Sequence, residues 1–434
     1  MNIWTKVTLL LAISMFASAG AASVQASKPE KQLTAAFVRN GDLWIKTGET
    51  EKQLTKGETI RYPKWSFDGK WIAYTRGENE KELWVWNVPT GETRLVRSGV
   101  DKNYQWAPTR DHLAFEQDQQ LYEVDPAAPE KPDLVVQDIS NFSWLPDGSG
   151  FLASSGAKLL PDGWTPVRIL KIPLTAKGDP SRFETLYVLP KQSDAFFAVG
   201  TSVFKWSATG QWIAFLATPT ASLSADSNTL CTLSSDGSQF KTIGQMANND
   251  QWFQWADEGE TLAYIGGPGR EGTSNKQLKV TNVPQAAPIV YTPAGYVDVS
   301  FTWVDSRTMI ASRAKEAEWT GDTAKRQLPF LVQVKLNKQR QKQLTSNSHV
   351  YGDFNPISLP FQRLAWVSSD RSTAKVTLAG RSGHHAVTWI ENLTIGDSYY
   401  EQWDWRSVLS FYMRTQKSPY VYNEDIRHRV WAFF

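Results

Sequence analysis

Few side chains in this sequence have the spacing that catalysis or metal binding requires. Only five of the 434 residues are histidines, and His384 and His385 form the single adjacent pair. Neighbouring residues of a strand point to opposite faces, so these two imidazoles would not bind one ion together. The lone cysteine, Cys231, cannot form an internal disulfide or a cysteine-rich zinc site. The sequence therefore predicts neither a metal site nor a cofactor.

The glycine patterns of common enzyme families are also missing. No Gly-x-Ser-x-Gly turn holds a nucleophilic serine, and no glycine-rich phosphate loop precedes a helix pattern. The run 266–269 is rich in glycine but lies in a hairpin context, so we interpret it as a loop. Carboxylate pairs such as Asp257 and Glu258 fall in predicted turns and define no acid–base pair. These observations favour a non-catalytic protein, with catalysis left as the alternative.

The overall charge argues against a nucleic-acid partner. The 46 basic and 44 acidic residues leave a formal net charge of +2, which is too small for a strongly basic nucleic-acid binder. With 41% hydrophobic residues, the chain has the composition of a globular protein rather than a disordered one. We therefore expect a folded protein whose partner is neither DNA nor RNA.

The first 26 residues have the pattern of a secretory signal peptide. Lys6 provides the positive charge, 7–17 is a mostly apolar run without charge, and Val24-Gln25-Ala26 fits the small-x-small rule before a cut at Ser27. The apolar run is short for a membrane span of about 20 residues. We expect a mature chain that begins near Ser27, has no stable transmembrane segment and is secreted or periplasmic.

One sequence unit recurs along the rest of the chain. In its clearest copy, 62–74, an aromatic residue precedes a tryptophan, a polar turn follows, and an aliphatic-Ala-aromatic run ends the unit. Copies appear about every 50 residues, which indicates a repeat architecture. The tryptophan position of the successive copies is occupied by Trp65, Trp106, Trp144, Trp206, Trp255, Trp303, Asn355 and Trp405.

Each unit has the alternation of antiparallel strands. Phe204 and Trp206 lie two residues apart and so share one face of a strand, 208–210 forms a turn, and 213–215 forms the partner strand. Two further short strands follow in most units, as at 83–86. Four antiparallel strands per repeat are typical of a β-propeller blade, so the predicted fold is an all-β propeller.

The two ends of the chain are expected to close the ring together. Residues 33–55 contain the second, third and fourth strands of a unit but not the first, and the missing strand is predicted at 400–405. Shared closure protects strand edges that would otherwise pair with other chains. Seven internal units and this hybrid give eight blades. Seven blades is the alternative, because 408–413 also resembles a second strand and would let the last blade come wholly from the C-terminal part.

Several turns and strand ends match a known repeat. Trp65-Ser66-Phe67-Asp68-Gly69-Lys70 is followed by Ile72-Ala73-Tyr74, and Trp144-Leu145-Pro146-Asp147-Gly148 is a second close copy. Leu54-Thr55 and Leu344-Thr345 match the end of the unit. These units resemble the WD40-like repeat, also called PD40, of TolB and dipeptidyl-peptidase-IV propellers. The resemblance covers 33–412 and implies a single TolB-like propeller domain over 27–434, but it implies little about activity, because propellers host unrelated functions.

Three insertions enlarge the plain repeat and are the predicted contact regions. They span 154–201, 218–228 and 315–327, and loops on a rigid ring are common recognition sites. Their aromatic side chains either contact a partner or pack on their own blades. The candidate binding residues are Trp164, Phe196, Phe197 and Trp319.

The sequence favours a non-catalytic binding scaffold of the periplasm or cell envelope. The expected partner is an envelope or extracellular protein, with a cell-wall glycan as the other option. Two alternatives stay open: a propeller enzyme of polysaccharide lyase or hydrolase type with its site in the central channel, and a regulatory subunit of an envelope enzyme. A channel that gathers several histidines and carboxylates would favour the enzyme, and a face rimmed by aromatic residues would favour the scaffold.

Overall fold

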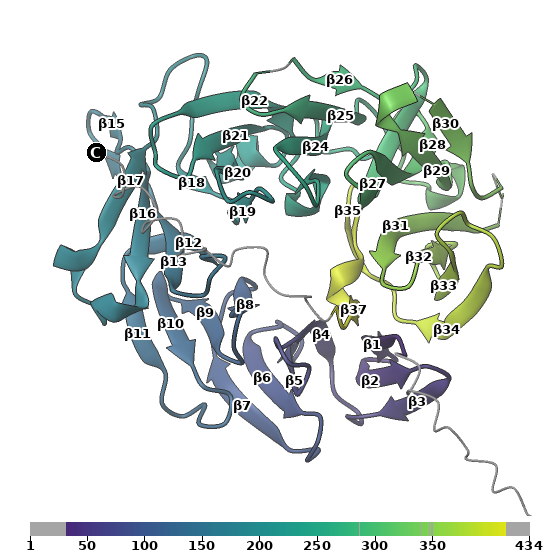
Figure 1. The fold of residues 1–434 in the computed structure, drawn as a ribbon, viewed down its shortest axis with the longest axis horizontal. Helices are drawn as coiled ribbons and strands as arrows, with labels where there is room; N and C mark the ends of the chain where they lie inside the picture. Colours follow the sequence, from purple (N-terminus) through teal and green to yellow (C-terminus); the bar gives the residue numbers. More distant parts are fainter. Residues whose placement is uncertain (1–31, 286, 339, 347, 349, 414–434) are drawn as a thin grey trace, which may run out of the picture. The chain divides into compact units, whose positions relative to one another are not determined.

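Eight antiparallel sheets, the blades, contain most of the strands in the described part of the chain. The computed structural model describes residues 32–413 except 286, 339, 347 and 349, and those from Leu33 onward belong to one compact unit. Each blade has four strand positions, and in one blade the innermost position is divided between two short strands. Figure 1 shows the sheets arranged as the blades of a propeller. The predicted fold is confirmed, with eight blades rather than seven.

Blade 1 joins the two ends of the described chain, and the other blades follow in sequence order. Blade 1 contains β1 (Thr34–Arg39), β2 (Asp42–Thr47), β3 (Thr50–Gln53) and β37 (Leu409–Phe411). Blades 2 to 4 contain β4 (Ile60–Trp65), β5 (Trp71–Arg76), β6 (Glu82–Asn87), β7 (Thr93–Ser98); β8 (Tyr104–Trp106), β9 (Leu113–Gln117), β10 (Gln120–Val124), β11 (Asp133–Val136); and β12 (Ile139–Trp144), β13 (Gly150–Ser155), β16 (Arg168–Pro173), β17 (Glu184–Val188). Blades 5 and 6 contain β18 (Gly200–Thr201), β19 (Lys205–Trp206), β20 (Trp212–Thr218), β21 (Asn228–Ser234), β22 (Phe240–Met246); and β23 (Phe253–Trp255), β24 (Thr261–Gly266), β25 (Gln277–Asn282), β26 (Ile289–Val290). Blades 7 and 8 contain β27 (Tyr296–Asp305), β28 (Thr308–Lys315), β29 (Phe330–Lys335), β30 (Arg340–Gln343); and β31 (Gly352–Leu359), β32 (Arg363–Ser369), β33 (Ala374–Gly380), β34 (Val387–Leu393).

Two short hairpins and a few helical turns complete the described elements. The hairpins are β14 (Leu159–Leu160) with β15 (Gly163–Trp164), and β35 (Asp397–Tyr399) with β36 (Gln402–Asp404). The helical turns are η1 (Leu174–Ala176), η2 (Pro180–Arg182), α1 (Ala221–Ser224), η3 (Asp250–Trp252), η4 (Thr323–Lys325), η5 (Leu336–Lys338) and η6 (Trp405–Ser407). Within the described ranges, no helix has the length and apolar character that crossing a bilayer requires.

The Asp-Gly turns of the repeat form as their chemistry predicts. Gly69 has a φ of 76°, a conformation that costs glycine little, and the Asp68 carboxylate accepts the backbone N–H of Lys70 at 2.8 Å. A Cβ at Gly69 would lie 2.7 Å from the Tyr412 ring, so the close approach of the C-terminal segment also requires glycine. This turn therefore joins two strands of blade 2 and contacts Tyr412, which follows the last strand of blade 1.

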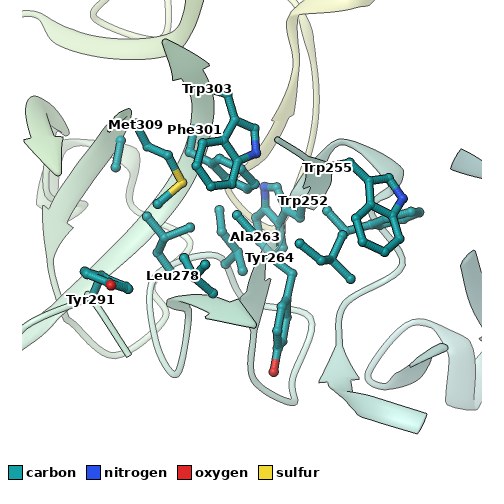
Figure 2. Close-up of a cluster of buried hydrophobic side chains, with 14 of the residues drawn as sticks. Trp252, Trp255, Ala263, Tyr264, Leu278, Tyr291, Phe301, Trp303 and Met309 are labelled. Carbon is teal, nitrogen blue, oxygen red and sulfur yellow. The ribbon is translucent and has the colours of Figure 1, made fainter. Parts of the chain in front are cut away.

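Large side chains fill the spaces between neighbouring blades. One cluster extends over blades 5, 6 and 7, and Figure 2 shows Trp255, Trp303, Tyr264 and Leu278 gathered in it. Ala263 belongs to the same cluster and is fully buried. Its small side chain allows the next sheet to approach closely, which explains the Ala of the aliphatic-Ala-aromatic run.

Reciprocal hydrogen bonds link the innermost strands of successive blades. The Trp303 indole donates to the Gln254 carbonyl at 3.1 Å, and the Gln254 side chain donates to the Phe301 carbonyl at 3.1 Å. The same indole bond is made by Trp65, Trp106, Trp144 and Trp255. The same return bond is made by Lys64, Gln105 and Lys205. The repeat thus favours a long hydrogen-bond donor directly before its tryptophan, because only such a side chain reaches the next blade.

Replacing Gln254 with leucine is expected to lower the free energy of unfolding by about 1 to 2 kcal/mol, because the Phe301 and Gln251 carbonyls lose their donor. Thr302 occupies the same position in blade 7, and its hydroxyl makes only long contacts of 3.4 and 3.5 Å. Thr302→Val is the matched control and should change stability by no more than about 0.5 kcal/mol. Urea unfolding of both variants measures the difference, and equal losses would contradict this role of Gln254.

The reciprocal pattern is interrupted between blades 4 and 5. Ser143 stands at the donor position and is too short to reach the next blade with a hydrogen bond from its own hydroxyl. That hydroxyl instead accepts the backbone N–H of Phe204 at 2.9 Å. The Trp206 indole N–H is buried and has no hydrogen-bond partner among the described residues. The innermost strand is also divided here, into β18 and β19.

The prediction of shared closure is confirmed, but the predicted closing strand is wrong. The strand that pairs with β1 is β37, with Ala36 opposite Ser410, and not 400–405. The Ser410 carbonyl accepts the Trp65 indole, so Phe411 and not Trp405 occupies the tryptophan position of this blade. Trp405 lies in η6 and is 1% exposed. The repeat spacing placed the closing strand at 400–405. A hairpin and a helical turn occupy those residues instead, so the closing strand comes later in the chain.

The tryptophan position of blade 8 is also shifted from its prediction. Ser358 pairs with Leu364, as Trp65 pairs with Ile72 in blade 2, so Ser358 and not Asn355 is the equivalent residue. Asn355 has a φ of 46° and lies in a break of the strand register. A bulge adds residues to one strand only. The repeat spacing therefore pointed to Asn355, although Ser358 is the equivalent residue.

Candidate functional site

The long connections of the propeller leave the same face. In an antiparallel blade, the connections from the second to the third strand and from one blade to the next leave one end of the sheet, and the remaining connections leave the other end. We call these ends the insertion face and the turn face. The insertion face carries 156–167, 189–199, 219–227, 267–276 and 316–329. The insertions singled out in the sequence therefore gather their longest loops on one side.

Residues 397–407, here called the central hairpin, lie on the inner side of the ring at the insertion face. They comprise β35, β36 and η6, and Figure 1 shows them in yellow on the inner side of the ring between β27 and β37. Asp397 bonds to blade 2, whereas the Gly272 N–H of blade 6 donates to the Tyr400 carbonyl at 2.7 Å. Blades 7 and 8 contribute Arg326 and Arg371. The segment therefore runs along the inner side of the ring and contacts blades 2, 6, 7 and 8.

A buried carboxylate holds the turn of the central hairpin. Glu401 accepts Arg326 at 3.0 Å and Arg371 at 2.6 Å, and the three side chains are 5%, 11% and 8% exposed. Tyr400 and Glu401 have φ angles of 48° and 67°, a conformation that two-residue hairpin turns need and that residues with a Cβ adopt at a cost. The ion pairs of Glu401 offset that cost, so its carboxylate positions the whole turn.

A second set of charges holds the base of the hairpin. The Arg406 guanidinium donates to both oxygens of Asp250, at 2.9 and 2.8 Å, and to Asp404 at 3.0 Å. Burial opposes ionisation of Asp250, but Arg406 prevails and holds the pKa of that carboxyl well below its usual range. Burial lowers the pKa of Lys64 and of Lys205 to about 8. The centre of the ring is thus a network of lysine, arginine and aspartate side chains.

The start of the hairpin is held on blade 2. The Tyr62 hydroxyl donates to the Asp397 carboxylate, and the Arg61 guanidinium lies 3.7 Å from the same group. Burial, together with the Asp397 charge, raises the pKa of Tyr62 above its usual range. Tyr62 has a φ of 54°, which is uncommon for a residue with a side chain and fits a position fixed by its contacts.

The four candidate aromatic residues do not form one site. Trp319 packs on Tyr400, with ring centroids 4.8 Å apart, and so supports the central hairpin. Trp164 lies in β15 opposite Leu159. Phe196 is 7% exposed and packs against Phe240, while Phe197 is half-buried. Phe196 therefore offers little surface to a partner, whereas Trp164, Phe197 and Trp319 keep exposed area on the insertion face.

Sequence reasoning missed the residues of the central hairpin itself. Tyr399 is 49% exposed, and the Arg270 guanidinium lies 5.7 Å from the Tyr400 ring centroid. The signal was present as consecutive aromatic and charged residues at 397–406, which a plain propeller strand does not need. The paired arginines could not be foreseen, because Arg326 and Arg371 come from loops of different blades.

The described residues, 32–413 apart from the four gaps, hold no cluster of metal-binding side chains. No group of three His, Cys, Asp or Glu side chains comes together there. His112 lies 2.9 Å from Glu123 on the turn-face side of blade 3. His384 and His385 follow β33 at a turn-face connection. The charged side chains at the base of the central hairpin are mainly lysine and arginine, which do not act as ligands for a metal ion.

Two glutamates of blade 3 respond to their surroundings in opposite ways. Burial, helped by the charge of Asp101, raises the pKa of Glu116 to about 7. Glu123 is half-buried, and burial opposes its ionisation, but hydrogen bonds from His112 and Arg110 prevail and lower its pKa. Because the pKa of Glu116 is higher in the folded protein, the free energy of unfolding falls as the pH rises from about 4.5 to above 7. Because the pKa of Glu123 is lower in the folded protein, the free energy of unfolding falls as the pH drops below about 4.5.

Glu116→Gln is therefore expected to raise the free energy of unfolding at pH 8 by about 1 to 3 kcal/mol. It should leave the free energy of unfolding unchanged near pH 3, where the carboxyl is protonated in both the folded and the unfolded state. Glu123→Gln is the matched control with the opposite sign. It should lower stability at pH 8 by about 1 kcal/mol, because Arg110 and His112 lose a charged acceptor. Urea unfolding at both pH values tests the pair, and equal signs at pH 8 would contradict it.

Comparison with known proteins supports the fold alone. No protein-family model matches the sequence, and no curated protein matches it. Among solved structures, dipeptidyl peptidase 4 of Porphyromonas gingivalis is similar, with a TM-score of 0.53 and 12% identity over 85% of this chain and 58% of that one. TolB of Acinetobacter baumannii matches with a TM-score of 0.37 and 17% identity over 58% of this chain and 61% of that one. An oligogalacturonate lyase of Vibrio parahaemolyticus matches with a TM-score of 0.44 and 11% identity over 81% of this chain and 97% of that one.

The length of these matches limits what they imply. The chain spans about half the length of the puromycin-hydrolysing peptidases that it resembles, 54% in two of them. The similarity to dipeptidyl peptidase 4, at a TM-score of 0.53, agrees with the fold that the repeat resemblance implied. At such low identity the likeness extends to the propeller fold and to no site residue.

Proposed function

We propose that this protein is a non-catalytic binding scaffold of the periplasm or cell envelope, which binds an envelope protein through its insertion face. The observation that carries the proposal is the central hairpin, which lies on the inner side of the ring at that face and bonds to blades 2, 6, 7 and 8. A partner that approaches from this side meets the central hairpin and the loops that hold it. The location rests on the signal-peptide pattern of the first 26 residues.

The composition of the insertion face supports binding of a protein. Tyr399 is 49% exposed, and half-buried Trp319 and Tyr400 stand beside it with Arg270 and Arg326. Tyrosine, tryptophan and arginine are the side chains most often responsible for binding energy in protein interfaces. Contacts among the three rings and with the two arginines hold the rings in place, so little side-chain entropy is lost on binding.

The test is recovery of a stoichiometric partner from envelope extract by the chain from Ser27, washed at moderate salt. Tyr399→Ala should reduce the recovered partner at least about tenfold, as expected when an interface hot spot is truncated. Phe361→Ala is the matched control, because Phe361 is 56% exposed on the turn face. Equal recovery by both variants, or retention only on isolated wall polysaccharide, would overturn the proposal and favour the glycan or lyase alternative.

A further inference from the structure

Positive charge is concentrated in one part of the sequence. Residues 323–390, which form the outer half of blade 7 and most of blade 8, contain ten lysine and arginine residues but only two acidic residues, Asp353 and Asp370. The whole chain has a formal net charge of only +2, so the rest of the chain is acidic on balance. Such an asymmetry is typical of a protein that binds an anionic surface or polymer through one region.

Five of these cations form a group without carboxylates. On the insertion face, Arg326 and Arg371 are already bound by Glu401. Asp353 and Asp370 accept hydrogen bonds from neighbouring tryptophan, serine and threonine residues instead of from cations. The remaining group, which we call the basic patch, has no ion-pair partner among the residues that the structure describes and consists of Lys335, Arg340, Lys342, Arg363 and Arg381.

Strand pairing brings the blade 7 cations of the basic patch together. Lys335 at the end of β29 is directly opposite Arg340 at the start of β30, and Lys342 follows on the same face of β30. The opposite face of β30 carries Gln341, whose side chain donates to the Tyr291 carbonyl beside blade 6 at 2.6 Å. The three cations therefore lie on the face toward blade 8, and all three are exposed. Like charges directly opposite in a sheet lower stability, so this arrangement favours an anion that covers them.

The turn after β33 adds the blade 8 cations to the basic patch. The Arg381 N–H donates to the Gln362 carbonyl at 2.8 Å, directly beside Arg363 at the start of β32. A Cβ at Gly383 of the same turn would lie 3.4 Å from the Leu344 Cβ, which follows β30 on the face that carries the exposed cations. The five cations thus gather on the outer turn-face side of blades 7 and 8, which Figure 1 shows next to each other.

The nearest carboxylates of the turn face lie closer to the ring axis. Asp257, Glu258 and Asp305 belong to connections from the first to the second strand of blades 6 and 7. Burial raises the pKa of Asp257, although the charge of Arg381 opposes that rise. The Nε–H groups of Arg363 and Arg381 are buried and have no acceptor within the described ranges. The outer part of this face therefore keeps its positive charge.

Two exposed apolar side chains flank the basic patch. Phe361 is 56% exposed two residues before Arg363, and Val387 is 55% exposed where β34 begins, after the turn that holds Arg381. A soluble polyanion gains little from an exposed phenyl ring. The surface of an anionic bilayer binds cations through its headgroups and apolar side chains at the boundary of its acyl chains. The combination therefore favours a lipid surface over a soluble polymer.

We propose that the basic patch docks this protein on a membrane surface of anionic phospholipids. The cations bind headgroup phosphates, and Phe361 and Val387 enter the interface between headgroups and acyl chains. Each lysine or arginine near such a surface raises affinity about fivefold, so the contact is reversible and weakened by salt. The insertion face stays free for a protein partner, whose binding does not involve Phe361. This membrane contact goes beyond the proposed scaffold function and does not depend on it.

Sedimentation with vesicles tests the proposal without any partner protein. The chain from Ser27 is mixed with vesicles of phosphatidylcholine alone, or of phosphatidylcholine and phosphatidylglycerol in equal parts. The protein should sediment with the anionic vesicles only, and about 0.5 M salt should release it, because the Debye length then falls to about 4 Å. No binding to the anionic vesicles, or equal binding to both kinds, would overturn the proposal. Tighter binding to soluble polyphosphate at the same phosphate concentration would also overturn it.

Charge reversal locates the contact. Arg340→Glu with Lys342→Glu should lower the affinity for anionic vesicles at least about 25-fold, about fivefold for each cation lost. One new glutamate would face Lys335 across the sheet as an ion pair, so thermal unfolding should show no loss of stability. Lys131→Glu with Lys177→Glu is the matched control, because these exposed lysines lie on the turn face of blades 3 and 4, across the ring in Figure 1. The control should bind as the parent chain does, and equal losses from both double variants would overturn the proposal.

Discussion

A chain that ends at Gly396 is expected to lose its soluble monomeric form. This truncation removes β37, which supplies the innermost strand of blade 1 and pairs with β1. Without it, the edge of β1 is open, although Ala36 and Phe37 are fully buried in the intact protein. The Trp65 indole also loses the Ser410 carbonyl. An uncovered apolar strand edge pairs with other chains, so the expected result is aggregation.

The matched control is a chain that ends at Met413 and keeps β37. Expression, solubility and size-exclusion chromatography of the two truncations measure the contribution of 397–413. We expect a monomer with a cooperative thermal transition from the chain that ends at Met413 and insoluble or aggregated protein from the shorter one. A stable monomer from the chain that ends at Gly396 would contradict closure of the ring by its two ends.

Glu401→Ala is expected to lower the free energy of unfolding by about 3 to 5 kcal/mol, the usual loss when one member of a buried ion pair is removed. Arg326 and Arg371 would keep their positive charges at 11% and 8% exposure with no carboxylate between them. The turn residues would also keep their costly φ angles without the contacts that offset them. The loss should be accompanied by a change in the fluorescence of Trp319, which packs on Tyr400.

A neighbouring ion pair provides the control for this prediction. Asp322 and Lys325 are paired at 3.4 Å on the same loop as Arg326, but their side chains are 49% and 74% exposed. Asp322→Ala should cost no more than about 1 kcal/mol, because exposed ion pairs contribute little. Urea unfolding at neutral pH compares the two variants. Similar small losses from both would show that Glu401 does not hold the central hairpin.

The repeat made most of the fold predictable. Trp65, Trp106 and Trp255 stand before polar turns in the sequence, and in the structure each donates to the preceding blade. The repeat spacing also predicted Asn355 and Trp405 at the tryptophan position, and both predictions are wrong. A bulge in β31 and the helical turn η6 add residues locally, and spacing alone does not reveal where a strand register breaks.

The candidate site was less predictable than the fold. Long insertions were visible as departures from the repeat, and their position on one face follows from antiparallel connectivity. Contacts such as that of Glu401 with Arg326 and Arg371 join residues 75 and 30 positions apart. Such pairings depend on how the blades meet, so the roles of Trp319 and of the central hairpin required the structure.

The claim on which the other conclusions depend is that Leu409–Phe411 closes the ring beside β1, and disulfide trapping tests it most directly. Ala36 and Ser410 are opposite each other in the antiparallel register, where Cα atoms lie about 5.5 Å apart, a separation that a disulfide spans. The natural Cys231 is buried, so it should not interfere. Ala36→Cys with Ser410→Cys is expected to form an intramolecular disulfide under mild oxidation and to raise the melting temperature. Formation of a disulfide by Ala36→Cys with Trp403→Cys instead, as closure by 400–405 would require, would contradict it.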